Sequence, residues 1–376
     1  MTRMSRSFSG ALAALVLVAG PVAAQVTLPS DNTAYGTTAA EFLLLGAGAR
    51  GLSLGGAYAA LATDVTSLYY NPAGAAQIAR PGALFSSYSY AVNTKYIWAG
   101  LALPFSGGAR TIGLQIGNFG FSGQPVYTVE NPDGDGTKYS VAQTFVGATY
   151  AQNFSDRFSA GLTFKAISDA LGKTSANAVA VDFGTNFHAQ AMNRPIRVSF
   201  VIQNLGSDLK HSGSALDQTV SRPPVPGQVD VPQEAQPAEL QTKEWGLPVM
   251  FRVGAALDAY ANEQTRVTVL SEFTQPNNNR AGFGFGAEFM LNDIGKSGFF
   301  FAGRGSWSYQ PDNTLDYVGA NAGFQSTMSG KENTDGLAGG FGLGYRRPSL
   351  ELGFDYAYRS LGLLGGTNMM SFTVSW

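Results

Sequence analysis

The chain has 376 residues, of which 13% are charged, 12% are aromatic and 47 are glycine, and its formal net charge is −2. Ordinary usage of roughly 7% would give about half as many glycines, and the near-neutral charge provides no basic surface for a nucleic acid. Few charges together with many aromatic residues and glycines favour a membrane β-barrel over a soluble α/β enzyme, with a soluble all-β protein as the alternative.

Residues 1–24 have the pattern of a secretory signal peptide. Arg3 and Arg6 give a positive start, residues 11–20 form an apolar run too short to span a bilayer as a helix, and Val22-Ala23-Ala24 is a small-residue cleavage site. We expect the mature chain to begin at Gln25, and a buried N-terminal helix is the alternative. The absence of cysteine excludes a lipoprotein signal and a Cys/His metal site.

Residues 25–82 form a polar stretch followed by a segment, 38–82, that is rich in glycine and alanine and poor in charge. Side chains this small build no core of their own, so we expect the segment to lie as a hatch inside a barrel. Glycine permits positive φ and close backbone contact, and Asn71-Pro72 is a turn or helix-start signal. The residues that we expect to form the hatch motif are Gly46, Gly48, Arg50, Gly51, Gly55, Gly56, Asp64, Asn71, Pro72 and Gly74.

Two members of this motif, Arg50 and Asp64, are charged. Asp64 is also placed to cap a short helix that would run through Tyr70. Because a charge beside a lumen needs a partner, we expect a network with inward-facing charges of the barrel. A role in holding the hatch in place is favoured over contact with a ligand. The expected lumenal charges are Arg157, Lys165, Glu288, Glu351 and Asp355.

Residues 83–376 alternate with a period of two, which is typical of strands. In residues 157–167, for example, Phe158, Leu162 and Phe164 alternate with small, polar or charged side chains. The small and polar face suits a lumen that holds a hatch, and the aromatic face suits lipid. The pattern therefore predicts an all-β fold, a transmembrane antiparallel β-barrel.

Fourteen strands are predicted, and an even count places both termini on the periplasmic side. The longest connections, 120–138, 205–248 and 309–337, all fall on the other side, which supports the count. The proline-rich connection 205–248 is either a docking arm or a variable surface loop, and residues 315–326 are either strand or loop. The predicted strands are 83–92, 95–105, 110–119, 139–152, 157–168, 177–189, 195–204, 249–260, 264–274, 280–291, 297–308, 338–347, 349–360 and 367–376.

The last predicted strand ends the chain on an aromatic residue. Phe372, Val374 and Trp376 share one face and alternate with polar residues. This ending resembles the signal read by the barrel assembly machinery of the outer membrane, and the alternative is a chain that merely ends on a core aromatic. We therefore expect the outer membrane of a diderm bacterium as the location, with the assembly machinery and outer-membrane lipid as partners.

The hatch segment resembles the PorV/PorQ family of outer-membrane proteins, which is itself similar to the FadL long-chain fatty-acid transporters. The resemblance rests on Glu41-Phe42-Leu43, on residues 46–51 and 54–62, on Asp64 and on residues 67–74. It implies a fourteen-stranded barrel with an N-terminal hatch. In PorV-like proteins it implies docking of a secretion translocon and its secreted cargo in type IX secretion.

In FadL-like proteins the same resemblance implies uptake of long-chain fatty acids or other hydrophobic small molecules. The chain is short for a FadL transporter, so docking for secretion is the first expectation and transport is the alternative. A plain structural barrel or leaky porin is a third reading, which the hatch disfavours. Transport would need an apolar path past the hatch, whereas a docking barrel could be sealed.

No motif in the sequence indicates catalysis. Gly46, Gly48 and Gly51 have the spacing of a dinucleotide fingerprint, but no βαβ unit surrounds them. No nucleophile motif accompanies His188 or His211, and the acidic residues lack the spacing of a calcium loop. We therefore expect no enzyme activity, no cofactor and no metal.

Overall fold

The computed structural model describes residues 34, 36–129, 131–220, 235–311 and 336–376. Fourteen of the described strands pair into a closed antiparallel barrel, in the order β1-β16-β15-β14-β13-β12-β11-β10-β7-β6-β5-β4-β3-β2. These strands are β1 (Gly82–Ser89), β2 (Lys95–Phe105), β3 (Arg110–Pro125), β4 (Lys138–Ser155), β5 (Phe158–Leu171), β6 (Thr174–Ala191), β7 (Arg194–Gly206), β10 (Met250–Ala261), β11 (Thr265–Pro276), β12 (Gly282–Ile294), β13 (Phe299–Tyr309), β14 (Leu337–Arg347), β15 (Leu350–Ser360) and β16 (Gly366–Ser375).

The predicted fold class, a fourteen-stranded antiparallel barrel, is confirmed. The predicted strand 95–105 has the bounds of β2, and the largest shift is in β3, which continues to Pro125 rather than ending at 119. A bulge between Phe121 and Gln124 lets β3 keep pairing with β4 beyond the point where the alternation breaks. The signal peptide, residues 25–33 and the segment 315–326 lie outside the described residues.

Part of the long connection 205–248 forms a separate hairpin. Strands β8 (Asp217–Val220) and β9 (Gln236–Glu239) pair with each other, and every residue in both strands is exposed. These two strands are not predictable from the sequence, because strands of four residues without apolar alternation give no periodic signal.

The barrel is apolar outside, whereas its inward face combines polar and charged side chains with small and buried apolar ones. Phe164 and Phe285 point outward and are 60% and 48% exposed, whereas the inward-facing Thr163 and Glu288 are 0% and 1% exposed. This arrangement is the reverse of a soluble sandwich and confirms the predicted assignment of the two faces. No helix among the described residues has the length and apolar character needed to cross a membrane.

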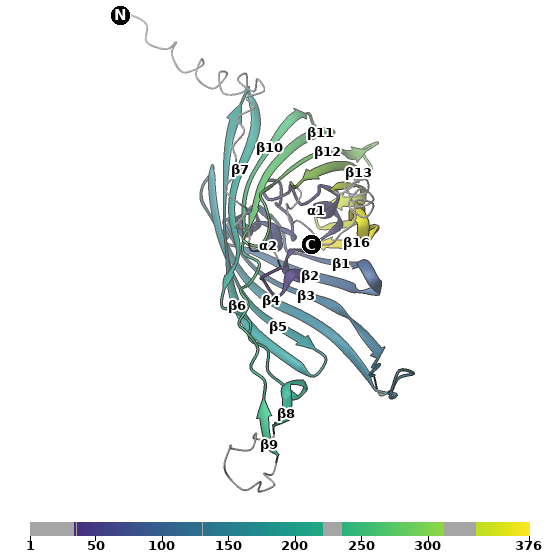
Figure 1. The fold of residues 1–376 in the computed structure, drawn as a ribbon. Coiled ribbons are helices and arrows are strands. Elements are labelled where there is room, and N and C mark those ends of the chain that lie inside the picture. Colours follow the sequence, from purple (N-terminus) through teal and green to yellow (C-terminus); the bar gives the residue numbers. More distant parts are fainter. Residues whose placement is uncertain (1–33, 35, 130, 221–234, 312–335) are drawn as a thin grey trace, which may run out of the picture. The chain divides into compact units, whose positions relative to one another are not determined.

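The hatch segment, residues 36–81, lies inside the ring of barrel strands (Figure 1). It contains two short α-helices and two of the 3₁₀-helices, and its side chains contact strands all around the wall. Leu68 packs on Gly113 of β3, and Ala57 packs on Gly284 of β12. The described helices are α1 (Ala49–Ser53), α2 (Ser67–Tyr70), η2 (Glu41–Leu44), η3 (Pro72–Gln77), η4 (Ala91–Asn93), η5 (Ser106–Gly108), η6 (Ser214–Leu216) and η7 (Gly362–Leu364).

Wall glycines give the hatch the room it needs. A Cβ atom at Gly113 would lie 2.1 Å from the side chain of Leu68, and one at Gly161 would lie 2.4 Å from the backbone of Pro72. Small residues at these inward positions therefore let the hatch backbone approach the strands directly. The glycine-rich inward face noted in the sequence has this physical cause.

Glycines of the hatch itself have two roles. Gly46, Gly48, Gly55 and Gly56 have φ of +97°, +70°, +64° and +79°. Gly51 has no positive φ, and its close neighbour is Tyr70 of the hatch rather than the wall, since a Cβ there would lie 2.5 Å from the Tyr70 ring. At Gly74 a Cβ would lie 1.8 Å from the carbonyl oxygen of Ala62, so only glycine fits there.

Asn71 starts a helix in the way its sequence context indicates. It is extended, with φ −159° and ψ 101°, and its side chain accepts a hydrogen bond from the backbone N–H of Ala73 while Pro72 occupies the first turn of η3. Asp64 does not cap helix α2 as predicted. Helix α2 begins only at Ser67, and the Asp64 carboxylate accepts the backbone N–H of Thr66 at 2.9 Å, so it orders the turn before the helix.

Candidate functional site

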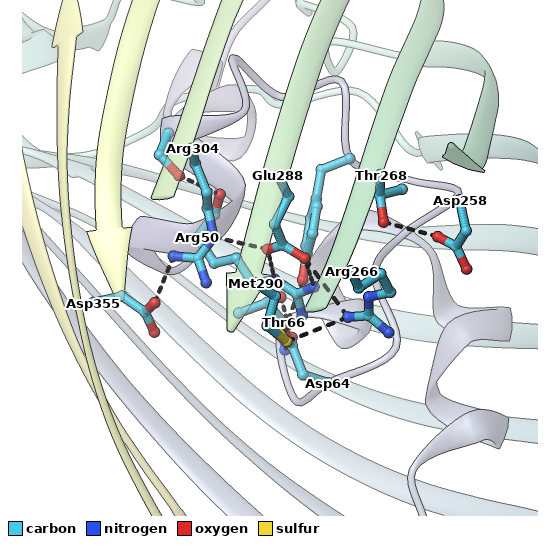
Figure 2. Close-up of polar contacts among 12 residues, drawn as sticks. Arg50, Asp64, Thr66, Asp258, Arg266, Thr268, Glu288, Met290, Arg304 and Asp355 are labelled. Carbon is cyan, nitrogen blue, oxygen red and sulfur yellow. Dashed lines mark hydrogen bonds and ion pairs between the residues drawn. The ribbon is translucent and has the colours of Figure 1, made fainter. Parts of the chain in front are cut away.

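Arg50 of helix α1 joins the hatch to the barrel wall through charged hydrogen bonds (Figure 2). Its Nε and Nη2 donate to the two carboxylate oxygens of Glu288, on β12, at 2.8 and 2.7 Å. Its Nη1 donates to Asp64 at 2.8 Å. Glu288 also accepts Nε of Arg304, on β13, at 2.7 Å, and Arg304 donates to Asp355, on β15, at 2.6 Å.

These five residues are called the Arg50 network below. The two arginines and three carboxylates alternate in space, so each buried charge has an opposite charge beside it, which offsets part of the cost of removing it from water. The structure thus brings together Arg50, Asp64, Glu288 and Asp355 from the sequence analysis. Arg304, which connects Glu288 with Asp355, was not predicted as a member of the network. Its position on the inward face of a predicted strand could have indicated it.

A second pair of charges holds the backbone of the hatch. Arg252 of β10 donates through Nη1 to Glu272 of β11 and to the carbonyl oxygen of Gly56, both at 3.1 Å. The other oxygen of Glu272 accepts the N–H of Ala59 at 2.9 Å. Sequence reasoning missed both residues, although each is a charged position on the inward face of a predicted strand.

Lys165 lies in a third, separate cluster. Its Nζ is 2.6 Å from Asp182 of β6 and donates to Asn204 of β7 at 2.8 Å. The β6–β7 register slips here, and Asn204 has a φ of +60°. Asp182 accepts the N–H of Asn204 at 2.8 Å, so the ion pair stabilises this irregularity of the wall. Lys165 is lumenal as expected, yet it does not reach the Arg50 network.

One expected lumenal charge, Arg157, does not lie on the inward face, and another, Glu351, faces inward but lies at the rim. Arg157 is exposed in the turn between β4 and β5. Glu351 lies near the start of β15 and pairs with Arg80 at 3.1 Å and Arg346 at 2.7 Å. Alternation along a strand identifies the face of a residue but not its height in the barrel, and both residues lie at the rim.

The expected assembly signal faces outward. Phe372, Val374 and Trp376 are exposed on the outer surface of the last strand and its end. The backbone N–H of Trp376 donates to the carbonyl oxygen of Pro81 at 3.0 Å, next to the start of β1. Recognition by the assembly machinery stays a prediction.

A pocket of about 670 Å³ lies between the start of the hatch and the end of the barrel that carries the longest connections. Phe42 and Leu45 of the hatch contribute to it, with Tyr88 at the end of β1 and Phe119 of β3. Polar and charged side chains line it as well, and they are Thr38, Glu41, Gln143, Asp169, His211, Arg359 and Thr367. A pocket of this volume, lined by apolar and aromatic side chains together with several polar ones, has the size of a small-molecule site, and it is called the mouth pocket below.

The start of the hatch is fastened to the loops around the mouth pocket. The N–H of Ala39 donates to the carbonyl oxygen of Gly246 at 2.9 Å, and the amide of Asn278 donates to the hydroxyl of Thr38 at 2.6 Å. Burial raises the pKa of the Glu41 carboxyl above its usual value, and hydrogen bonds from Thr38 and Asn278 offset part of this shift. Polar contacts between the hatch and the loops therefore form this edge of the pocket.

A larger hollow, of about 1250 Å³, lies on the outer face of the wall. Outward-facing side chains line it, among them Phe85, Leu114, Phe164 and Phe372. In a membrane such a face contacts lipid chains, whereas the mouth pocket opens beside the hatch. We therefore take the mouth pocket, with the hatch beneath it, as the candidate functional site.

The two histidines lie in different surroundings. His211 contributes to the mouth pocket, with Nε2 3.5 Å from Asp169. His188 lies on the inward face of β6, opposite Arg197 of β7. Within the described ranges no group of three or more His, Cys, Asp or Glu residues could hold a metal ion.

No protein-family model and no curated protein matches the chain. Among solved structures, the toluene transporter TodX of Pseudomonas putida has a TM-score of 0.54 at 10% identity, over 88% of this chain and 97% of that chain. The toluene transporter TbuX of Ralstonia pickettii has a TM-score of 0.51 at 12% identity, over 89% and 98%. The CymD monoaromatic hydrocarbon channel has a TM-score of 0.52 at 14% identity, over 88% and 97%.

At these identities the likeness concerns the fold alone. The closed fourteen-strand barrel is similar in fold to these three structures, and the likeness extends over nearly the whole of each chain. A relation to PorV/PorQ proteins is not shown by these comparisons.

Proposed function

We propose that the chain is an outer-membrane channel of the FadL type that takes up small hydrophobic molecules through the mouth pocket. The observation that carries this proposal is the pocket itself, which has apolar and aromatic side chains in its lining and lies at the start of the hatch, beside the connection 205–248. Transport was the alternative in the sequence analysis, and the fold comparisons favour it over docking for secretion.

The proposed location follows from the outer surface. Aromatic and aliphatic side chains cover the outward face of the strands, which is where a membrane barrel contacts lipid. We propose outer-membrane lipid as the surroundings of the wall and the barrel assembly machinery as a partner during insertion.

In this proposal the hatch moves to let a ligand pass, because the strands pair all the way around the barrel. Several contacts of the hatch with the wall are hydrogen bonds and ion pairs, among them those of Arg50 and Ala59. Water that enters on movement solvates these groups again, which lowers the cost of separating them. The wall can therefore stay intact while the hatch shifts.

An uptake assay tests the proposal. The full chain is expressed in a diderm host that lacks its own FadL-type channels, and entry of radiolabelled toluene and octanol is measured. We expect faster entry than in cells with an empty vector. Ala39→Trp should remove the gain, because Ala39 lines the pocket. The matched control is Ala109→Trp, since Ala109 is exposed at the opposite end of the barrel.

Docking for secretion remains a second candidate, because the β8–β9 hairpin exposes both of its strands. A pull-down of the full chain from its own membrane distinguishes the two functions. Recovery of a translocon subunit and secreted proteins, together with no gain in uptake, would favour docking. Uptake without such partners would favour transport.

A further inference from the structure

A basic side chain faces the outside of the wall at the end of the barrel away from the mouth pocket. Arg347 is the last residue of β14, and by alternation it shares the outward face of that strand with Phe341, Leu343 and Tyr345. Phe341 and Leu343 are 37% and 48% exposed on this face, as side chains that contact lipid are. Arg347 therefore lies where the apolar outer face of the strand ends.

Aromatic rings hold the Arg347 side chain on this outward face. Its Nε donates to the hydroxyl of Tyr345 at 2.6 Å, and its guanidinium carbon lies 5.3 Å from the centre of the Tyr345 ring. The Tyr345 ring packs in turn on Phe299, the first residue of β13, with the ring centres 5.1 Å apart. Outward-facing aromatic side chains near a strand end form the girdle of a membrane barrel at the interface with water. Arg347 is thus held at the level of lipid head groups.

No acid in the described part of the chain pairs with Arg347. Its only side-chain hydrogen bond there is the one from Nε, so both Nη groups have no protein partner. Glu351 of β15 is engaged by Arg80 and Arg346 instead. Arg80 also donates to the carbonyl oxygens of Arg347 and Pro348, at 2.9 and 3.1 Å. The turn that carries Arg347 is therefore fixed, while the charge of Arg347 is left uncompensated.

A second basic side chain, Lys296, lies exposed in the neighbouring turn between β12 and β13. The N–H of Arg346 donates to the carbonyl oxygen of Gly298 at 2.8 Å, which joins this turn to the end of β14. A Cβ at Gly298 would lie 3.5 Å from Nε of Arg347. The one acid of the turn, Asp293, accepts the N–H of Gly298 at 2.8 Å and attracts Arg347 only from beyond ion-pair distance. Two cations therefore face one acid at this edge of the barrel.

We propose that Arg347 and Lys296 bind the head group of an anionic phospholipid in the leaflet that surrounds this end of the barrel. The inference rests on the proposed location in the outer membrane and goes beyond the proposed transport. The two Nη groups of Arg347 present donors in one plane, which fits phosphate oxygens. The excess of positive charge favours a lipid with a net negative charge over a zwitterionic one. Leu350, the cross-strand neighbour of Arg347, is 37% exposed and provides apolar surface for the acyl chains.

The test compares dioleoylphosphatidylglycerol with dioleoylphosphatidylcholine, which share the phosphate and the acyl chains and differ in net charge. Each lipid is titrated into the detergent-solubilised full chain, and native mass spectrometry measures the bound fraction. We expect phosphatidylglycerol to bind more tightly. In Arg347→Gln its affinity should fall about fivefold, and in Arg347→Gln/Lys296→Gln by roughly a further fivefold, as for one basic contact with anionic lipid each. The affinity for phosphatidylcholine should change little.

Two further variants separate charge from geometry. Arg347→Lys keeps the charge without the planar fork, and its affinity for phosphatidylglycerol should lie between those of wild type and Arg347→Gln. Tyr345→Phe keeps the ring but removes the hydroxyl that holds Nε, so it should lower this affinity less than Arg347→Gln does. Lys173→Gln is the matched control, because Lys173 is exposed in the turn between β5 and β6 at the other end of the barrel.

Equal affinity of the wild-type chain for the two lipids would overturn the inference. So would an Arg347→Gln variant that keeps the wild-type preference. A Lys173→Gln variant that loses as much as Arg347→Gln would also overturn it, since the net charge of the chain would then account for binding. Unchanged heat-modifiable gel mobility shows that each variant is folded. Toluene uptake by Arg347→Gln should equal that of wild type, so a failed uptake assay counts against the proposed function and not against this inference.

Discussion

At Glu288, two arginines from distant parts of the sequence share one carboxylate. Arg50 comes from the hatch and Arg304 from the neighbouring wall strand, and the carboxylate is 1% exposed. Removing one member of a buried ion pair leaves the remaining charge without compensation. Glu288 is therefore the residue on which the attachment of the hatch depends most.

Glu288→Gln should weaken docking of the hatch by about 3–5 kcal/mol, because Arg50 and Arg304 lose their shared charge. Hydrogen exchange of residues 49–70, followed by mass spectrometry, measures the change. Glu351→Gln is the matched control, since Glu351 forms partly exposed pairs at the rim, and such pairs contribute about 0–1 kcal/mol. Equal exchange in both variants would contradict the assigned role of Glu288.

Gly74→Ala should be the more damaging of two glycine substitutions. A Cβ at Gly74 would lie 1.8 Å from the carbonyl oxygen of Ala62, whereas one at Gly305 meets nothing within 4 Å. Thermal unfolding should show a lower midpoint for Gly74→Ala and little change for Gly305→Ala. Similar midpoints would mean that the hatch adapts its backbone around Gly74.

For single residues, the sequence predicted which face of a strand a side chain occupies better than it predicted which side chains it contacts. Alternation placed Glu288 and Asp355 inside, and the structure joins Glu288 to Arg50 directly and Asp355 to Arg304, which binds the same Glu288. The same rule failed for Arg157 and gave the face but not the height of Glu351, because a period of two carries no information about position along the barrel axis. Partners such as Arg304 depend on the register between strands, which a single sequence does not specify.

For the secondary-structure elements, the sequence predicted that the barrel strands exist. It did not predict the register shift between β6 and β7 or the short β8–β9 hairpin. Fourteen alternating segments correspond to the fourteen barrel strands. The slip between β6 and β7 at Asp182, and the short β8–β9 hairpin, depend on contacts such as that of Asp182 with Asn204. Alternation gives no sign of such contacts.

The last strand provides a test at this scale. Trp376→Ala should lower the amount of folded barrel in the outer membrane, because the terminal aromatic is proposed to be read during assembly. Trp307→Ala is the control, since Trp307 is also an outward-facing, exposed tryptophan. Fractionation with heat-modifiable gel mobility measures both variants. Normal levels of folded Trp376→Ala barrel would mean that the terminal aromatic is not read during assembly.

For the whole molecule, the structure combines a closed wall, a hatch and a mouth pocket. The wall is apolar outside, the hatch is held by polar contacts, and the pocket lies where the hatch meets the outer loops. The sequence indicated the wall and the hatch. The pocket could not be predicted, because it is formed by residues from the hatch, several strands and a loop that meet only in the folded chain.

The most direct test of the account is a hatch that can be locked. A Cβ at Gly55 would lie 3.4 Å from that of Ser306 on β13, close to the spacing in a disulfide, and the chain has no other cysteine to compete. Because Gly55 has a φ of +64°, a cysteine there strains the backbone, and the reduced form of the same variant is the reference that carries this strain without the lock. Gly286→Cys with Ser306→Cys is the control, because these cross-strand neighbours lie at the same spacing within the wall.

Uptake of toluene is then measured in cells that carry either pair, before and after reduction. We expect cells with the oxidised Gly55→Cys/Ser306→Cys chain to take up no more toluene than empty-vector cells and to recover uptake when the chain is reduced, while the control pair stays active throughout. Undiminished uptake through the oxidised, locked hatch would contradict the central claim that ligands pass through this barrel by movement of the hatch.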